Sequence, residues 1–273
     1  MGNESVAKPV GTQVREEDSF DLAAVDAWLK QNVSGLVGTP EVRQLVGGAS
    51  NLTYLLDYDN RRVVLRRPPV GKKAASAHDM QREFRVQQAL RPVFPYVPEM
   101  LAYCGDTSIV GSDFYVMEFL DGTVLRAKTA KDEGLDEQTT RAICLSAIDR
   151  LVDLHGIDPA AAGLADLGKG DGYVGRQVAG WSKRYGDAHT WNVPSMKKVM
   201  RWLDANQPAD VATCIIHNDF RIDNLVLDPA DLTRVQGVLD WEMATLGDPL
   251  MDLGGAMAYW IQADDPGYMQ RAR

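Results

Sequence analysis

The sequence predicts an α+β protein of two lobes, in which a small antiparallel sheet with one main helix precedes a mainly helical half. Short β-like runs crowd residues 37–121, a single helical segment lies among them, and helical periodicity dominates residues 122–273. The chain has 273 residues, 45% of them hydrophobic and 25% charged. That is enough for two lobes with a sizeable core.

Composition limits the function. The net charge of −9 argues against general binding to nucleic acid or anionic membranes and favours small-molecule ligands. No run of about 18 apolar residues exists, and the polar N-terminus lacks the pattern of a signal peptide. We therefore expect a cytoplasmic protein without nucleic-acid or membrane partners, and the sequence leaves the oligomeric state open. Three cysteines without metal-ligand spacing are expected to be buried free thiols: Cys104, Cys144 and Cys214.

Residues 1–36 are expected to form a leader, mobile up to residue 18, and one packing helix. Asp21 is a favourable N-cap, and apolar residues then recur at helical spacing until Gly35 ends the pattern. This segment predicts packing and little chemistry.

The β-like half begins with an antiparallel meander. Alternating β-branched segments and turn signals predict its strands, and Ser76 with Asp79 three residues later predicts the start of a helix. The expected elements are strands over 42–46, 51–58, 61–67, 97–105 and 113–122, and a helix over 76–90.

The second half is mainly helical, with a long apolar periodicity over 136–155. Three short strands are expected further on, over 214–217, 224–228 and 236–241. Asp248 followed by Pro249 then predicts the start of another helix, because these residues suit its N-cap and first position.

The stretch HNDFRIDN, residues 217–224, places proton-accepting and metal-binding groups at the end of an apolar strand. A strand-loop-strand unit can bring Asp219 and Asn224 together with Asp240, which ends the following strand. In phosphoryl transfer, one aspartate orients the attacking hydroxyl, while an asparagine and a second aspartate hold Mg²⁺ against nucleotide phosphates. Oxygen ligands suit Mg²⁺, and a histidine without a nearby cysteine is poor material for zinc. A polar turn with capping acids is the alternative.

Three further segments accompany this loop: GGASNLTY at 47–54, VVLRRPP at 63–69 and LDWEMATLGDPLMDLG at 239–254. With them, residues 20–273 resemble the aminoglycoside phosphotransferase and choline kinase group of the protein-kinase-like fold. The chain most resembles the kinase-like domain associated with some acyl-CoA dehydrogenases. The resemblance implies a two-lobed kinase fold that binds ATP and Mg²⁺.

The resemblance also assigns roles in the loop. Asp219 corresponds to the catalytic base, His217 to the residue that braces the loop, and Asn224 and Asp240 to the Mg²⁺ ligands. The resemblance also implies that residues 37–121 form the nucleotide-binding lobe and the hinge. Residues 122–273 become the catalytic and acceptor-binding lobe, apparently shortened because relatives usually continue beyond this point.

In the N-terminal lobe, Gly48, Ser50 and Asn51 lie where the family has its phosphate-covering hairpin. Backbone and side-chain donors there could meet phosphate oxygens, although a tight turn without a ligand would have the same sequence. Arg66 stands where the family has a lysine that contacts the phosphates, and its planar guanidinium keeps the charge with a different geometry.

Glu83, on the following helix, is the candidate ion-pair partner of Arg66, or else a solvated helix charge. Main-chain groups from Glu118 to Leu120 are expected to contact adenine. In the C-terminal lobe, His155 is expected to pack under the catalytic loop, and Asp252 to brace its backbone.

The acceptor is expected to be a hydroxylated small molecule. Clusters of basic residues in 61–73 and 183–201 could receive an anionic acceptor such as a hydroxyacyl-CoA, or form a solvated basic face. Four aromatic residues could line the acceptor pocket or lie in the core: Trp181, Tyr185, Trp191 and Trp202.

Three other functions stay open. The arginine at position 66 and the early terminus are compatible with a non-catalytic nucleotide-binding module. The family also contains aminoglycoside kinases. A metal-dependent phosphohydrolase could use the acids Asp219, Asp223, Asp240 and Glu242, but it would leave the two upstream segments unexplained.

Overall fold

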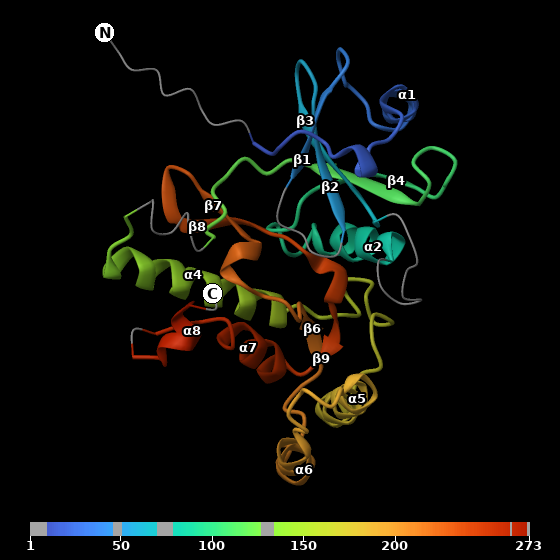
Figure 1. Ribbon diagram of the computed structural model, residues 1–273. Helices are drawn as coiled ribbons and strands as arrows, with labels where there is room; N and C mark the ends of the chain where they lie inside the picture. The colour runs from blue at the N-terminus through green and yellow to red at the C-terminus, as the bar shows by residue number, and fades with distance from the viewer. Residues whose placement is uncertain (1–9, 46–50, 70–78, 127–133, 263, 272–273) are drawn as a thin grey trace. The chain divides into compact units, whose positions relative to one another are not determined.

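The chain divides into two compact units, Met1–Asp121 and Gly122–Arg273. The computed structural model describes residues 10–45, 51–69, 79–126, 134–262 and 264–271 (Figure 1). The predicted division into an N-terminal helix, a nucleotide-binding lobe and a catalytic lobe remains a prediction. Within the described ranges, no helix is long and apolar enough to cross a membrane.

The first unit is built on a five-stranded antiparallel sheet with the strand order β1-β2-β3-β5-β4. The predicted meander is present as its first three strands, and the two further strands are present as well. The strands are β1 (Glu41–Leu45), β2 (Leu52–Asp57), β3 (Arg62–Arg67), β4 (Met100–Cys104) and β5 (Phe114–Glu118).

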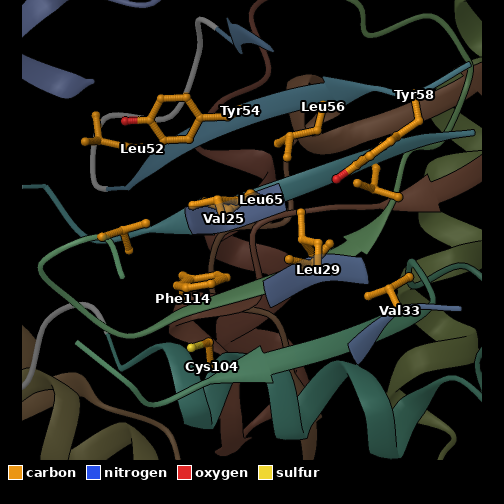
Figure 2. Close-up of a cluster of buried hydrophobic side chains, with 13 residues drawn as sticks. Val25, Leu29, Val33, Leu52, Tyr54, Leu56, Tyr58, Leu65, Cys104 and Phe114 are labelled. Atoms are coloured by element: carbon orange, nitrogen blue, oxygen red, sulfur yellow. The ribbon is translucent and has the colours of Figure 1, made fainter. Parts of the chain in front are cut away.

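Helix α1 (Leu22–Asn32) covers one face of this sheet. The Asp21 carboxylate caps it by accepting from two backbone N–H groups, as predicted from the sequence. Figure 2 shows Val25 and Leu29 of α1 among strand side chains such as Leu65. Because neighbouring residues of a strand point to opposite faces, Leu65 faces α1 while Val64 belongs to a second buried cluster.

Helix α2 (Met80–Leu90) supplies that second cluster through Met80, and it contacts β4 and β5 (Figure 1). The helix was predicted, but its start was wrong. Asp79, whose carboxylate accepts from the Arg82 N–H at 2.9 Å, is the N-cap, and Ser76 lies outside the described residues. The Ser-x-x-Asp pattern resembles a capping box, and its last residue caps the helix instead of its first.

Residues 10–18 are anchored to the sheet, so the expectation of a mobile leader is wrong for them. Thr12 forms a backbone bridge with Gln44 of β1, and the Gln44 amide donates to the Asp18 carboxylate at 2.9 Å. Residues 1–9 lie outside the described part of the chain.

Arg67 holds this anchored segment from the α1 side of the sheet. It is only 2% exposed, and its guanidinium donates to the carbonyl oxygens of Asp18 at 2.6 Å and Val110 at 2.9 Å, and to the Tyr54 hydroxyl. Its charge is therefore distributed over buried acceptors, which is what a buried cation needs.

The second unit combines helices with two small antiparallel sheets. Helix α4 buries Ile143, Ala147, Leu151 and Leu154, which recur at helical spacing. The helices are α4 (Glu137–His155), α5 (Tyr173–Ala188), α6 (Lys197–Asn206), α7 (Pro249–Met257) and α8 (Gly267–Arg271).

The three expected strands of this unit are present, and β9 (Thr245–Gly247), which was not predicted, pairs with β6 (Cys214–Ile216). The other pair is β7 (Leu225–Asp228) with β8 (Asp231–Val238). The last strand was expected over 236–241, but β8 begins five residues earlier and ends before Asp240, which was expected to end it. Gly247 in β9 is required by close packing, because a Cβ there would lie 2.4 Å from Ile216 and 3.0 Å from the Tyr173 ring. A three-residue strand that contains glycine carries too little pattern to be predicted from sequence.

We expect Arg67→Met to lower the free energy of unfolding by about 2–4 kcal/mol, because several buried acceptors lose their donor. Chemical denaturation measures this difference. Arg61→Met is the control, since Arg61 makes only a peripheral 3.7 Å ion pair with Glu99, and such pairs contribute about 0–1 kcal/mol. Equal losses in the two variants would contradict the structural role of Arg67.

Candidate active site

The candidate catalytic loop begins where β6 ends, and a buried carboxylate holds its first two residues. The backbone N–H groups of His217 and Asn218 donate to the two oxygens of Asp252, at 2.8 and 2.7 Å. Asp252 lies on α7 and is 1% exposed. The sequence-based expectation that Asp252 braces the loop backbone is therefore confirmed.

His155 at the end of α4 supports the same carboxylate. Its Nε2 lies 3.0 Å from Oδ2 of Asp252, so it contacts the brace and not the loop itself. Asp248 is the N-cap of α7, with Pro249 as the first residue, as predicted. The second oxygen of Asp248 accepts from the Val211 N–H at 2.6 Å, which ties the segment before β6 to α7.

His217 is fully buried, and its contacts fix its tautomer. Nε2 lies 3.0 Å from the Leu239 carbonyl oxygen, which can only accept, so Nε2 carries the proton. Nδ1 then accepts from the Asp219 N–H at 3.3 Å. Burial lowers the pKa of His217, against the opposing effect of Asp252 and other nearby acids. A neutral ring therefore links the loop to the end of β8.

Asp219 and Asn224 are held together by the Asn224 side chain. Its Nδ2 donates to the Asp219 carbonyl at 2.9 Å and to the Asp219 carboxylate at 3.1 Å. This leaves the Asn224 Oδ1 on the other end of the amide, where a carbonyl oxygen can serve as a metal ligand. Burial raises the pKa of Asp219, although Arg221 and Asn224 oppose the shift. A raised pKa suits a general base at neutral pH.

Asp240 follows β8 and adopts a left-handed backbone with φ of 70°. The preceding residue, Leu239, donates its N–H to the Asn224 carbonyl at 2.8 Å, which brings the two chain segments together. The Asp240 charge adds to the burial that raises the pKa of Asp219.

The donors present fit Mg²⁺. In the described chain no three histidine, cysteine or acidic residues gather into a metal cluster. Asn224 and Asp240 offer two oxygen donors, and Mg²⁺ commonly takes one or two protein ligands and completes its shell with water and phosphate oxygens. Their roles as ligands remain a prediction.

Arg221 was missed by the sequence analysis. Its guanidinium donates to the Asp223 carboxylate at 2.8 Å, lies over the Tyr259 ring at 4.7 Å, and places Nε 3.7 Å from the Asp219 carboxylate. It therefore partly balances the acids of the loop. Asp219 and Asp223 lie two residues on either side of Arg221, but Tyr259 is far along the chain. The contact with Tyr259 leaves no spacing signal, so only the structure reveals it.

In the first unit, the predicted ion pair between Arg66 and Glu83 is present. Nη1 of Arg66 lies 2.7 Å from Oε1 of Glu83, and both side chains are buried. The reading of Glu83 as a solvated charge is thus wrong. The contact of Arg66 with nucleotide phosphates remains a prediction.

The other residues assigned to nucleotide binding precede β2 in the sequence, or end and follow β5. Asn51 is buried just before β2, while Gly48 and Ser50 lie outside the described residues. Glu118 ends β5 and donates its backbone N–H to the Glu99 carbonyl at 2.9 Å, and Leu120 follows the strand. Their assignments remain predictions.

The basic cluster expected in 61–73 does not form a basic face among its described members. Arg61 and Arg62 pair with Glu99 and Asp121, Arg66 pairs with Glu83, and Arg67 is buried. Lys72 and Lys73 lie outside the described residues. Four arginines that look alike in sequence are thus occupied by partners inside the first unit.

The second basic segment, 183–201, is exposed. Its basic residues lie on α5 and α6, two neighbouring helices (Figure 1). Trp181, Trp191 and Trp202 in the same region are 58%, 96% and 62% exposed, so the expectation that they could be core residues is wrong. The Arg184 guanidinium lies over the Trp181 ring at 4.6 Å.

The first unit has a five-stranded antiparallel sheet with a buried arginine–glutamate pair to its helix. In the second unit, Asn224 is bonded to Asp219, and its carbonyl is bonded to Leu239, next to Asp240. These features define a protein of the kinase-like class. Residues 41–272 match the phosphotransferase enzyme family, and the chain belongs to this family.

Relatives and solved structures agree with this membership. Acyl-CoA dehydrogenase family member 11 of Gallus gallus is 37% identical over 259 residues, which are 93% of this chain and 33% of that protein. The chain thus spans about a third of the length of that relative. A Ralstonia eutropha protein solved as a candidate aminoglycoside phosphotransferase is 36% identical, with a TM-score of 0.77 over 90% of this chain and 71% of that one.

A third comparison shows the fold alone. An aminoglycoside phosphotransferase in complex with streptomycin and ATP is 18% identical, with a TM-score of 0.57 over 86% of this chain and 74% of that one. The predicted two-lobed kinase-like fold is confirmed by these neighbours.

The neutral His217 is testable by NMR of the imidazole nitrogens. We expect the Nε2–H tautomer, with a ring that stays neutral below the ordinary histidine pKa of about 6.5. Because the folded pKa is lowered, this ring stabilises the fold above about pH 6.5, and the contribution is lost as the pH falls.

The variant His217→Gln keeps a side-chain donor and removes the titration. It should therefore flatten the fall in unfolding free energy between about pH 7 and pH 5. A protonated His217 at neutral pH, or an Nδ1–H tautomer, would contradict the geometry described above.

Proposed function

We propose that the protein is a Mg²⁺- and ATP-dependent phosphotransferase that transfers the γ-phosphate to a hydroxyl group of a small molecule. The observation that carries this proposal is the Asn224 amide, which is hydrogen-bonded to Asp219. It holds the candidate base beside the candidate metal ligand on one short loop. Membership of the phosphotransferase family supports the same reaction.

In the proposed reaction, Asp219 accepts the proton of the acceptor hydroxyl. The hydroxyl oxygen forms the new bond to the γ-phosphorus, the bond to the β-phosphate oxygen breaks, and ADP leaves. Bound Mg²⁺ would neutralise charge on the phosphates and would be held by Asn224 and Asp240. In the first unit, Arg66, fixed by Glu83, would contact nucleotide phosphates. His217 and Asp252 keep the loop in shape and take no part in the bond changes.

For the acceptor, we propose a hydroxyacyl-CoA. Relatives named as acyl-CoA dehydrogenase family members match over most of this chain, and the exposed basic and aromatic residues around α5 and α6 suit an anion with aromatic and apolar parts. An aminoglycoside is the second candidate, favoured by the solved Ralstonia eutropha relative. A polycation is, however, poorly matched to exposed lysines and arginines.

The two other functions are less well supported. A hydrolase that uses several acids would need them in one cluster, and the described residues contain no such cluster. In addition, Asp223 is paired with Arg221. A non-catalytic nucleotide-binding module differs from the proposed enzyme only in turnover, so it is separated from it by experiment.

The first test is Asp219→Asn. We expect phosphoryl transfer to fall by at least about 10³-fold because the base is lost, while ATP binding measured by calorimetry stays within about twofold. Asp240→Ala should instead weaken Mg²⁺-dependent ATP binding. Asp231→Asn, at the exposed first residue of β8, is the control and should change neither. Full turnover in Asp219→Asn would refute the role of Asp219.

The acceptor is tested by reversing charge on α6. Lys198→Glu is expected to raise KM for a hydroxyacyl-CoA about 5- to 10-fold, with KM for ATP unchanged, because one attractive charge becomes repulsive. Arg234→Glu makes the same change of net charge on β8 and should leave both KM values unchanged. Transfer to an aminoglycoside and not to the thioester would reject the proposed acceptor.

A further inference from the structure

We propose that Asn218 is a positioning residue of the candidate active site, which fixes the orientation of Asp219 through a hydrogen bond to Tyr173 at the start of α5. The inference rests on the proposed function for its effect on turnover. Its structural part, a link from α5 to the loop, stands on the contacts of Asn218 alone.

Asn218 joins three other segments of the second unit to the loop. Its backbone N–H donates to Asp252 on α7, its Nδ2 donates to the Met243 carbonyl at 3.1 Å, and its Oδ1 accepts from the Tyr173 hydroxyl at 2.8 Å. The carbonyl of Met243 can only accept, so it fixes which end of the amide is nitrogen and leaves the oxygen toward Tyr173. Met243 ends the short turn that follows Asp240. The Asn218 side chain therefore links the loop that carries Asp219 to the turn that follows Asp240.

The backbone of Asn218 explains why these bonds matter. Its φ of 65° is left-handed, a conformation that non-glycine residues adopt at a cost and that asparagine tolerates better than most. Residues kept in such a conformation need surrounding contacts to hold them there. This turn directs the next residue, Asp219, away from the line of β6.

Tyr173 is a rigid partner for this bond. It is 5% exposed and packs with Cys214 and Ile216 of β6, and its backbone N–H, with that of Val174, donates to the Asp210 carboxylate. Burial raises the pKa of Tyr173, so the hydroxyl stays protonated and donates. The first turn of α5 is thereby fixed to the strand before the loop and to the loop itself.

The consequence is a path from α5 to the base. The outer part of α5 carries the exposed Trp181 and Arg184, and its first residue is bonded to the residue that precedes Asp219. A displacement of the first turn of α5 would therefore act directly on the side chain of Asn218. Asn218 therefore acts through Asp219 and touches no reacting atom.

Asn218→Gly and Tyr173→Phe test the proposal. Glycine keeps the left-handed backbone without strain and removes both side-chain bonds, whereas phenylalanine removes only the hydroxyl. The probe is release of phosphate from Mg²⁺·ATP with water as acceptor, which needs no identified alcohol. We expect kcat to fall about 10- to 100-fold in Asn218→Gly and about 5-fold in Tyr173→Phe, with KM for ATP within about twofold, because misplacement of a base affects turnover more than binding.

The double variant gives the sharper result. If the two residues act through one bond, Asn218→Gly with Tyr173→Phe should be no slower than Asn218→Gly alone. Tyr58→Phe is the control, since it removes another tyrosine hydroxyl bond, to Asp26 at 2.9 Å in the first unit, and should leave kcat unchanged. Multiplicative losses in the double variant, or unchanged kcat in both single variants, would overturn the proposal.

A readout without turnover separates this proposal from the proposed function. In the ligand-free protein, both variants should shift the amide resonance of Asp219 and speed its hydrogen exchange at least about 5-fold, while Tyr58→Phe should do neither. If the wild-type protein neither releases phosphate nor transfers it to an acceptor hydroxyl, the proposed function fails, and the amide measurement still decides on Asn218. An unchanged Asp219 amide in both variants would overturn the positioning role.

Discussion

The candidate active site depends on the buried carboxylate of Asp252. A buried carboxylate must be satisfied by donors, and here two consecutive backbone N–H groups and the His155 ring supply them. At the end of a strand, two adjacent N–H groups can meet one carboxylate where the chain turns out of the strand direction. The left-handed Asn218 provides that turn, and Asp219 leaves the strand in consequence. The need of the buried Asp252 carboxylate on α7 for hydrogen-bond donors therefore determines the path of the catalytic loop.

The same need to satisfy buried charge divides Arg66 from Arg67. They are neighbours on β3, so they point to opposite faces of the sheet. Arg66 meets a carboxylate on α2, and Arg67 meets carbonyl oxygens from the anchored N-terminal segment. A single carboxylate neutralises Arg66 while leaving the rest of its guanidinium to other partners. The guanidinium N–H groups of Arg67 are bonded to acceptors within the first unit, so Arg67 has a structural role and is not expected to contact a ligand.

Local signals made much of the fold predictable. The caps at Asp21 and Asp248, the alternation in β1–β3 and the periodicity of α4 each lie within a few residues and were predicted from them. The ion pair of Glu83 with Arg66 and the bracing by Asp252 followed from the family pattern. The features that were not predicted depend on residues far apart in the sequence. Arg67 bonds to the anchored segment 10–18 through the Asp18 carbonyl. Tyr173 lies 45 residues from its partner Asn218. Neither pair leaves a spacing that a single sequence reveals.

These long-range bonds suit the chemistry for a physical reason. Asp219 must stay ionised to accept a proton, yet burial raises its pKa, and Arg221 and the Asn224 amide oppose that shift. A base balanced in this way is sensitive to small displacements, because each opposing contact weakens with distance. Local turn residues alone would let the loop fluctuate. Fixing it from α7, from the turn after Asp240 and from α5 restricts Asp219 to one position, and so keeps its charge as well as its direction.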